Sequence, residues 1–155
     1  MSVGYKEILD DLHDLLNAND TFKNNVSRHD FSVIADSGST AIVLRVGGFA
    51  HQGSGFGGEY AVGWDFFIDI YETYSAHIEE DVATLVKARD TVIDIIEKNT
   101  YLGKGPGNTS KITDAKLIRG DNLGVVFDED NETPTHFTLS VLVEVQQQHS
   151  VTLAE

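Results

Sequence analysis

Cysteine is absent from the sequence, and proline, methionine and tryptophan are rare, with two, one and one residues. Without cysteine the chain can form neither a disulfide nor a thiolate metal site, so packing must stabilise it. No stretch approaches the roughly 20 apolar residues of a membrane-spanning helix, and the first six residues lack the apolar run of a secretory signal. We therefore expect a protein that is made in a cytoplasm and has no membrane partner.

Positive charge is also scarce: 11 lysines and arginines stand against 25 acidic residues, and the formal net charge is −14. So few cations argue against direct nucleic-acid binding, which needs lysine and arginine to neutralise phosphates. Three interpretations of the acidic balance stay open: solubility, adaptation to high salt, and a surface that repels DNA passing close by. The 15 aspartates against 10 glutamates favour a high-salt habitat, whereas seven lysines against four arginines do not.

Residues 64–99 contain the two strongest patterns in the chain. In the first part apolar side chains occupy every second position, at Trp64, Phe66, Ile68 and Ile70, which is typical of a half-buried strand. From residue 76 to 99 the apolar spacing changes to three and four residues, which predicts a long amphipathic helix. Ser75 stands where an N-cap hydroxyl is expected. The strand and the helix each have one apolar side, so we expect them to pack against each other.

The remaining periodicity predicts a first helix over residues 5–17 and further strands over 31–34, 40–46, 112–119, 123–127 and 135–147. Hairpin-like connections favour a mostly antiparallel sheet with two helices packed on one face, an α+β fold. No linker divides the chain, so residues 1–147 are predicted to form a single domain. Residues 148–155 are polar and are predicted to be a loosely held tail.

Residues 47–63 contain seven glycines, with Phe49, Phe56 and Tyr60 between them. No Gly-Lys-Ser/Thr follows, so the segment does not match a phosphate-binding loop. The composition predicts a long flexible hairpin loop. The aromatic residues leave open a second interpretation, in which the loop becomes ordered against a partner chain.

An acidic turn is predicted at Asp128-Glu129-Asp130-Asn131-Glu132. Its start is similar to a calcium loop, but Thr133 stands where the invariant glycine belongs and Leu139 where the bidentate glutamate belongs. We therefore interpret the segment as the tip of a hairpin.

No motif for catalysis is present: the sequence has no nucleophile elbow, no metal ligands at convincing spacing and no recognisable acid–base pair. The inward faces of the two clearest strands are apolar, whereas an enzyme pocket would need polar side chains there. We predict no catalytic residue, no metal and no cofactor, and a structural or binding role.

The order of the predicted elements resembles that of a known protein family. The features are a Trp64-x-Phe-x-Ile-x-Ile-Tyr strand, a long helix ending near Ile96 and followed by Leu102-Gly103, and a final Phe137-x-Leu-x-Val-x-Val strand. Over residues 5–147 this order resembles the tail-terminator (tail-completion) proteins of long-tailed phages and related archaeal viruses.

The resemblance implies a structural virion protein of the tail or neck. It would form a hexameric ring on the head-proximal end of the tail tube, stop tube growth and dock to the head connector, with no catalysis. Its partners would be other copies of itself, the tail tube protein and the connector, and DNA would pass without specific binding.

Within this interpretation Phe49, Phe56 and Tyr60 are candidate interface residues, because aromatic residues are enriched in interface cores. Asp128, Glu129, Asp130 and Glu132 are candidates for the ring lumen or an interface. Two alternatives stay open: another ring protein of the same virus neck, and a small α+β ligand-binding protein or enzyme with a hydrophobic pocket.

Overall fold

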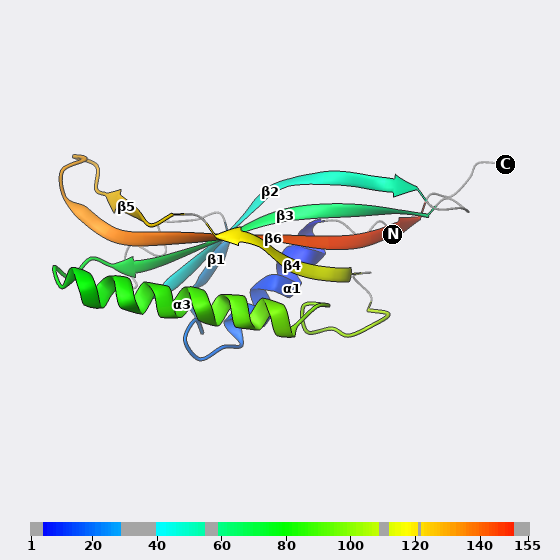
Figure 1. The fold of residues 1–155 in the computed structure, drawn as a ribbon, viewed down its shortest axis with the longest axis horizontal. Helices are drawn as coiled ribbons and strands as arrows, with labels where there is room; N and C mark the ends of the chain where they lie inside the picture. The colour runs from blue at the N-terminus through cyan, green and yellow to red at the C-terminus, as the bar shows by residue number, and fades with distance from the viewer. Residues whose placement is uncertain (1–4, 29–39, 55–58, 109–111, 121, 151–155) are drawn as a thin grey trace.

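The computed structural model describes residues 5–28, 40–54, 59–108, 112–120 and 122–150, and these form two helices and a six-stranded sheet (Figure 1). The helices are α1 (Tyr5–Asn17) and α3 (Ile78–Lys98). The strands are β1 (Val26–Arg28), β2 (Ala41–Ser54), β3 (Glu59–Thr73), β4 (Ile112–Gly120), β5 (Gly124–Phe127) and β6 (Pro134–Ser150). The strand order is β1-β2-β3-β6-β4, and β5 also pairs with β6. Only β1 and β2 are parallel, so the α+β prediction is confirmed.

The predicted alternation on β3 and β6 decides which face of the sheet is buried. Phe66, Ile68 and Ile70 on β3 are fully buried, and they pair in register with Val143, Val141 and Leu139 of β6. Since successive side chains of a strand point to opposite faces, all six lie on one side of the sheet. They form the main hydrophobic core together with the apolar sides of the two helices.

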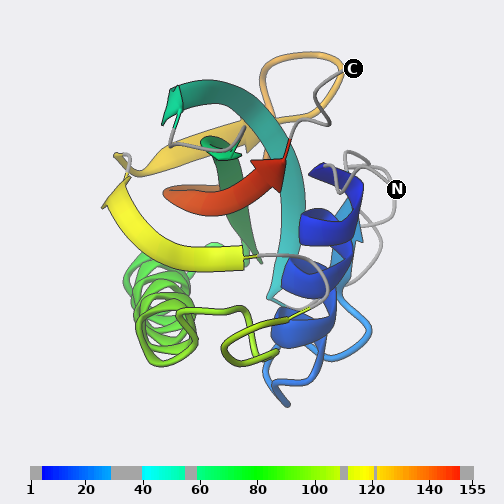
Figure 2. The same cartoon turned by 90° about the vertical axis from the view of Figure 1, so that its right-hand side faces the viewer.

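Both helices cover this apolar face, and they divide it between them (Figure 2). Helix α1 lies beneath β1 and β2, whereas α3 lies beneath β3, β6 and β4. The buried residues of α1 are Ile8, Leu9, Leu12 and Leu16, with Asp11, and those of α3 include Leu85, Val92 and Ile96. Leu102, which follows α3, is also buried in the core. The predicted helix over residues 5–17 is confirmed at both ends.

The prediction for residues 47–63 is wrong over most of its length. Residues 47–54 belong to β2 and residues 59–63 to β3, and the two strands pair across the predicted loop. The register shifts between Val46 and Gly48 and again between His51 and Ser54. A Cβ on Gly47 would lie 2.8 Å from the Phe67 ring. Glycine is therefore needed here because the strand bulges and its backbone passes close to this ring, not because the chain turns.

The predicted boundary of the C-terminal tail is also wrong. Strand β6 continues to Ser150, and residues 148–150 pair with residues 59–61 of β3. These polar residues are held in the sheet because β3 itself begins earlier than its alternation predicts. The predicted strand over 31–34 lies outside the described residues, and β1 at Val26–Arg28 was not predicted.

Candidate functional site

Three strands extend past the helices at one end of the molecule (Figure 1). They are the end of β2, the start of β3 and the end of β6, which pair with one another over residues 47–54, 59–64 and 145–150. We call this extension the arm. Its backbone is fixed by hydrogen bonding on both sides of β3, so side chains on the arm are presented by an ordered sheet.

Three aromatic residues meet where the arm joins the body. The rings of Phe49 and Trp64 are 5.3 Å apart, and those of Tyr5 and Trp64 are 6.0 Å apart. The Trp64 indole N–H donates to Oε1 of the fully buried Gln147 at 3.0 Å, which fixes the indole between its neighbours. Phe49 remains 68% exposed and Tyr5 48% exposed. We call Tyr5, Phe49 and Trp64 the aromatic cluster.

The three predicted interface residues have different positions in the structure. Phe49 belongs to the aromatic cluster and is the most exposed large apolar side chain among the described residues. Tyr60 is half-buried on β3, opposite Ser54 of β2 and His149 of β6. Phe56 lies outside the described residues. Tyr5 and Trp64 were not predicted to accompany Phe49, because no spacing in the sequence relates helix α1 to the arm.

The acidic turn connects β5 to β6 at the end of the molecule opposite the arm (Figure 1). One Asp130 carboxylate oxygen accepts the N–H groups of Glu132 and Thr133 at 2.7 and 3.1 Å. Asp128 accepts the Asp130 N–H at 3.1 Å. Asn131 has a φ of +57°, a left-handed conformation that asparagine tolerates in turns. The predicted hairpin tip is therefore confirmed, and two of its carboxylates build the turn.

Hydrogen bonding between Asp128 and Asp130 moves their pKa values in opposite directions. The bond raises the pKa of Asp128 above its ordinary value and lowers that of Asp130, and the N–H groups of Glu132 and Thr133 lower the Asp130 pKa further. Glu129 and Glu132 are exposed on the same turn. The acidic turn and the aromatic cluster are therefore two separate surfaces at opposite ends of the sheet.

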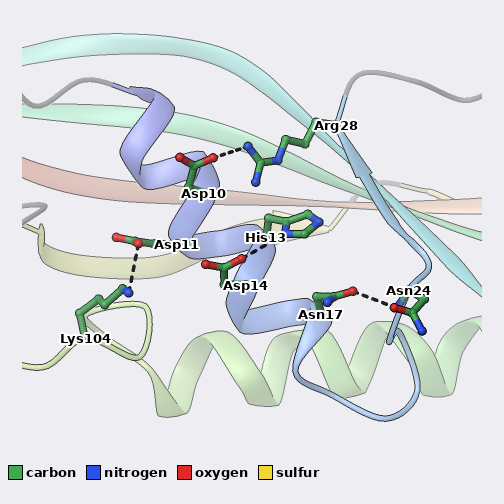
Figure 3. A network of polar contacts seen from close by, with 8 residues as sticks. All are labelled: Asp10, Asp11, His13, Asp14, Asn17, Asn24, Arg28 and Lys104. Carbon is green, nitrogen blue, oxygen red and sulfur yellow. Dashed lines mark hydrogen bonds and ion pairs between the residues drawn. The ribbon is translucent and has the colours of Figure 1, made fainter.

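Polar contacts fix α1 to its surroundings (Figure 3). Asp10 forms an ion pair with Arg28 of β1, and Asp11 lies 3.6 Å from the Lys104 ammonium in the segment after α3. At the end of α1, Asn17 accepts the Asn24 N–H at 2.9 Å. The sequence does not predict these pairs, because the partners are separated from α1 by loops. They hold the acidic side of α1 in a fixed orientation against the edge of the sheet.

A second set of polar contacts lies on the face of the sheet opposite the helices. Arg45 donates to both carboxylate oxygens of Asp69, and the Ser140 hydroxyl donates to Asp69 at 2.6 Å. The Arg45 guanidinium also lies over the Phe67 ring, 4.7 Å from its centre. Every polar group here has a partner within the sheet, so the cluster is a structural network across β2, β3 and β6.

The described residues contain no group of three or more metal-ligating side chains. An open surface hollow is lined by Ala76, His77, Ile78, Glu79 and Glu80 at the start of α3.

Neither helix of the described chain has the length and apolar character needed to cross a bilayer. Comparisons of the sequence with protein-family models and with curated proteins give no match.

Proposed function

We propose that this protein is a tail terminator of a tailed virus. Copies of the chain form a ring on the head-proximal end of the tail tube, stop the growth of the tube and dock to the head connector. The protein then acts through its outer surfaces in the virion and carries out no catalysis. Two features support this function: the order of the elements resembles that of tail terminators, and Phe49 is 68% exposed on an ordered arm.

The packed interior supports a role for the outside of the molecule. On the helix side of β3, Phe66, Ile68 and Ile70 are fully buried, and Leu85 and Val92 of α3 are fully buried with them in one core cluster. The competing idea, a ligand-binding protein or enzyme, needs a cavity in this region. Close packing leaves little room there for a ligand of metabolite size.

The aromatic cluster supports protein association. Phe49 gains little from its present position because most of its ring faces solvent, yet it packs against Trp64, which in turn packs against Tyr5. Aromatic residues with restricted motion give large contact areas at low entropic cost, and they are enriched in interface cores. We assign Phe49 to a protein contact, together with Tyr60 farther along the same arm on β3.

The negative charge supports the position on a DNA conduit. A net charge of −14 disfavours contact with phosphates, so DNA would pass the ring without being retained. The exposed carboxylates of Glu129 and Glu132 on the acidic turn are candidates for the lumen, and Asp128 and Asp130 hold the turn that presents them.

The assembly part of the proposal is tested by native mass spectrometry and light scattering of the purified chain, alone and with tail tube protein. We expect ring-sized oligomers in at least one of the two samples. Phe49→Ala should weaken assembly while the urea midpoint stays unchanged. Phe127→Ala is a matched control, because this aromatic residue is also half-exposed but lies beside the acidic turn. A chain that remains monomeric in both samples would refute the ring.

The terminator role itself is tested by measuring tube lengths in electron micrographs. Tail tube protein is polymerised with and without this chain, and tube ends are examined for an added ring. We expect shorter tubes of limited length with a ring at one end only. Tubes that grow to the same length with the chain present would contradict a terminator, and a ring found elsewhere in the neck would favour a different neck protein.

A further inference from the structure

Exposed apolar side chains are concentrated on one edge of the sheet. Strands β4 and β5 both pair with the side of β6 that faces away from β3. Gly120 pairs with Val141 and Gly124 with Thr138, so β4 and β5 follow each other along β6 as two halves of one edge. Seven large apolar side chains are exposed among the described residues, and four of them lie on this edge: Ile118, Leu123, Val125 and Phe127.

Strand β5 is uncovered on two sides. Within the described part of the chain β6 is its one strand partner, so the main-chain groups on its outer side have no strand beside them. Val125 pairs with Phe137, a core residue on the helix side of the sheet, so Val125 points to that side, and so does Phe127 two positions later. Helix α3 packs against β3, β6 and β4. Val125 and Phe127 therefore remain 42% and 48% exposed.

The two halves of this edge differ in charge. Lys116 and Arg119 are exposed on β4, and lysine on an edge strand is a common protection against pairing with another sheet. Strand β5 has the sequence Gly-Val-Val-Phe, with no charged residue and with residues that favour an extended conformation. An uncharged open edge of this kind is where an extended segment of another chain can add a strand.

The surroundings of β5 are strongly acidic. The acidic turn follows the strand directly, and the side chains of Glu129 and Glu132 are exposed there. At the same end of the molecule, the start of α3 adds the exposed Glu79 and Glu80 (Figure 1). Residues 75–81 and 122–133 contain no lysine or arginine. Charge of one sign beside an apolar strand selects a partner of the opposite sign and raises its rate of association.

We infer that β5 receives an extended segment of a partner protein, with apolar residues at alternate positions and lysine or arginine at the end beside the acidic turn. The segment adds a strand to the sheet, and its apolar side chains cover Val125 and Phe127. Its cations extend past the end of β5 toward Glu129 and Glu132. These two glutamates are thereby assigned to an interface, which is the second of the two roles that the sequence predicts for the acidic turn.

Within the proposed function, the partner is the head connector, because assembly of the ring is assigned to the arm at the opposite end of the molecule. This identification rests on the proposed function. The docking site itself rests on the exposed strand and on its acidic surroundings.

A second copy of the chain is the other occupant to test. Its β4 carries Lys116 and Arg119, and antiparallel pairing of two such edges would place β4 of each copy beside β5 of the other. That arrangement is reciprocal, so it gives a two-fold dimer and does not build a ring. Each copy also has a net charge of −14, so the two copies repel each other. Both points favour a basic partner.

The test uses fluorescently labelled, end-capped peptides and the purified full-length chain. Each peptide joins a stretch of alternating valine and threonine to a run of lysines, placed at the amino end in one peptide and at the carboxyl end in the other, because an open edge accepts either strand direction. We expect fluorescence anisotropy to show binding of at least one lysine peptide, with weaker binding at high salt. Peptides with glutamate in place of lysine should not bind. N-methylation of alternate peptide residues, which removes main-chain donors, should abolish binding.

Two variants of the chain locate the binding site. Val125→Thr with Phe127→Thr removes the apolar contact but keeps residues that form strands. Glu129→Gln with Glu132→Gln removes charge, while the two aspartates that build the turn are left unchanged. We expect each variant to bind the lysine peptide roughly tenfold more weakly than the wild type, or weaker still.

Each variant has a matched control. Tyr5→Thr with Phe49→Thr removes two exposed aromatic side chains away from β5, and Asp20→Asn with Glu97→Gln makes the same change of net charge at exposed positions elsewhere. Both controls should bind the peptide like the wild type. Circular dichroism and urea midpoints verify that each chain is folded, and Val125→Thr alone replaces the double variant if that one unfolds.

The inference is overturned if neither lysine peptide binds, if the β5 and glutamate variants bind as the wild type does, or if the N-methylated peptide binds equally well. A wild-type dimer in native mass spectrometry that is lost in the Val125 and Phe127 variant would assign β5 to a second copy and overturn it as well. The tube-length experiment separates these results from the proposed function. Rings that limit tube growth but bind no peptide leave the terminator role standing, whereas peptide binding at β5 with unlimited tube growth supports the docking site and refutes the terminator role.

Discussion

Asp81, in the first turn of α3, accepts two hydrogen bonds from Ser75, the residue that was expected to cap the helix. Ser75 does not cap the helix; its N–H and its hydroxyl donate to the two carboxylate oxygens of Asp81 at 2.7 and 2.6 Å. The N-cap residue is His77, whose side chain makes no capping hydrogen bond. The buried carboxylate therefore ties the chain before the helix to its first turn, where the helix dipole also favours negative charge.

We predict that Asp81→Asn lowers the melting temperature and that the loss depends on pH. Hydrogen bonds from the Ser75 side chain and backbone lower the Asp81 pKa below its ordinary value. The stabilisation is therefore complete above the unfolded pKa of about 4 and disappears as pH falls through the lower folded value. Glu80→Gln, on the exposed side of the same turn, is the matched control. Thermal melts at several pH values should show the gap between wild type and Asp81→Asn narrowing in acid, and a constant gap would contradict the prediction.

The fold class follows from periodicity because the strongest patterns coincide with the buried faces. Phe66 and Val143 fall on predicted apolar positions and are fully buried, since alternation along a strand directly selects its core side. The arm was missed because local composition does not distinguish a glycine in a turn from one in a bulge. At Gly47 the choice depends on Phe67, twenty residues later, whose ring leaves no space for a Cβ.

The candidate surfaces were predictable only in part, for a related reason. Phe49 was recognisable as an aromatic residue among glycines, but its contact with Trp64 depends on strand register, and the contact of Trp64 with Tyr5 depends on where α1 packs against the sheet. The acidic turn was predictable because all of its hydrogen bonds are local.

The ion pair between Arg45 and Asp69 should contribute to stability because Asp69 is buried. Asp69→Asn removes the charge that Arg45 and the Ser140 hydroxyl both contact, and we expect it to cost about 1–3 kcal/mol. In a double-mutant cycle with Arg45→Met, urea unfolding should give a favourable coupling of roughly 1 kcal/mol. Lys98→Met, which removes the exposed pair with Asp94, is the control and should change the free energy of unfolding by about 0.5 kcal/mol or less. Additive effects of the Arg45 and Asp69 substitutions would show that the pair contributes nothing.

Ala76 has a φ of +70° just before α3, a conformation that costs energy for a residue with a Cβ. Ala76→Gly should therefore raise the free energy of unfolding by about 0.5–1 kcal/mol. Ala83→Gly is the control, and its expected effect has the opposite sign. Ala83 is exposed within α3, so glycine there should lower the free energy of unfolding by about 1 kcal/mol. Urea unfolding of the two variants should give changes of opposite sign, and a loss in both would contradict the strained conformation.

His136 should make the fold less stable in mild acid. The side chain is buried on β6, with Thr135 Oγ1 3.0 Å from its Nδ1 and the Tyr71 ring edge-on to it. Burial lowers the His136 pKa below its ordinary value near 6.5, so between the two values the unfolded chain binds more protons than the folded chain. This term is absent at high pH and destabilises the folded chain as pH falls through the unfolded pKa toward the folded one.

The change to measure is His136→Gln, because glutamine keeps a polar side chain but does not titrate. We expect the stability difference between wild type and His136→Gln to shift against the wild type as pH is lowered from about 8 to about 5.5. The difference is the useful quantity, since protonation of other groups in this acidic chain is common to both proteins. His77→Gln is the control, because this histidine is exposed at the start of α3. If the wild type and His136→Gln respond identically to pH in urea unfolding, His136 is not held in its neutral form by the fold.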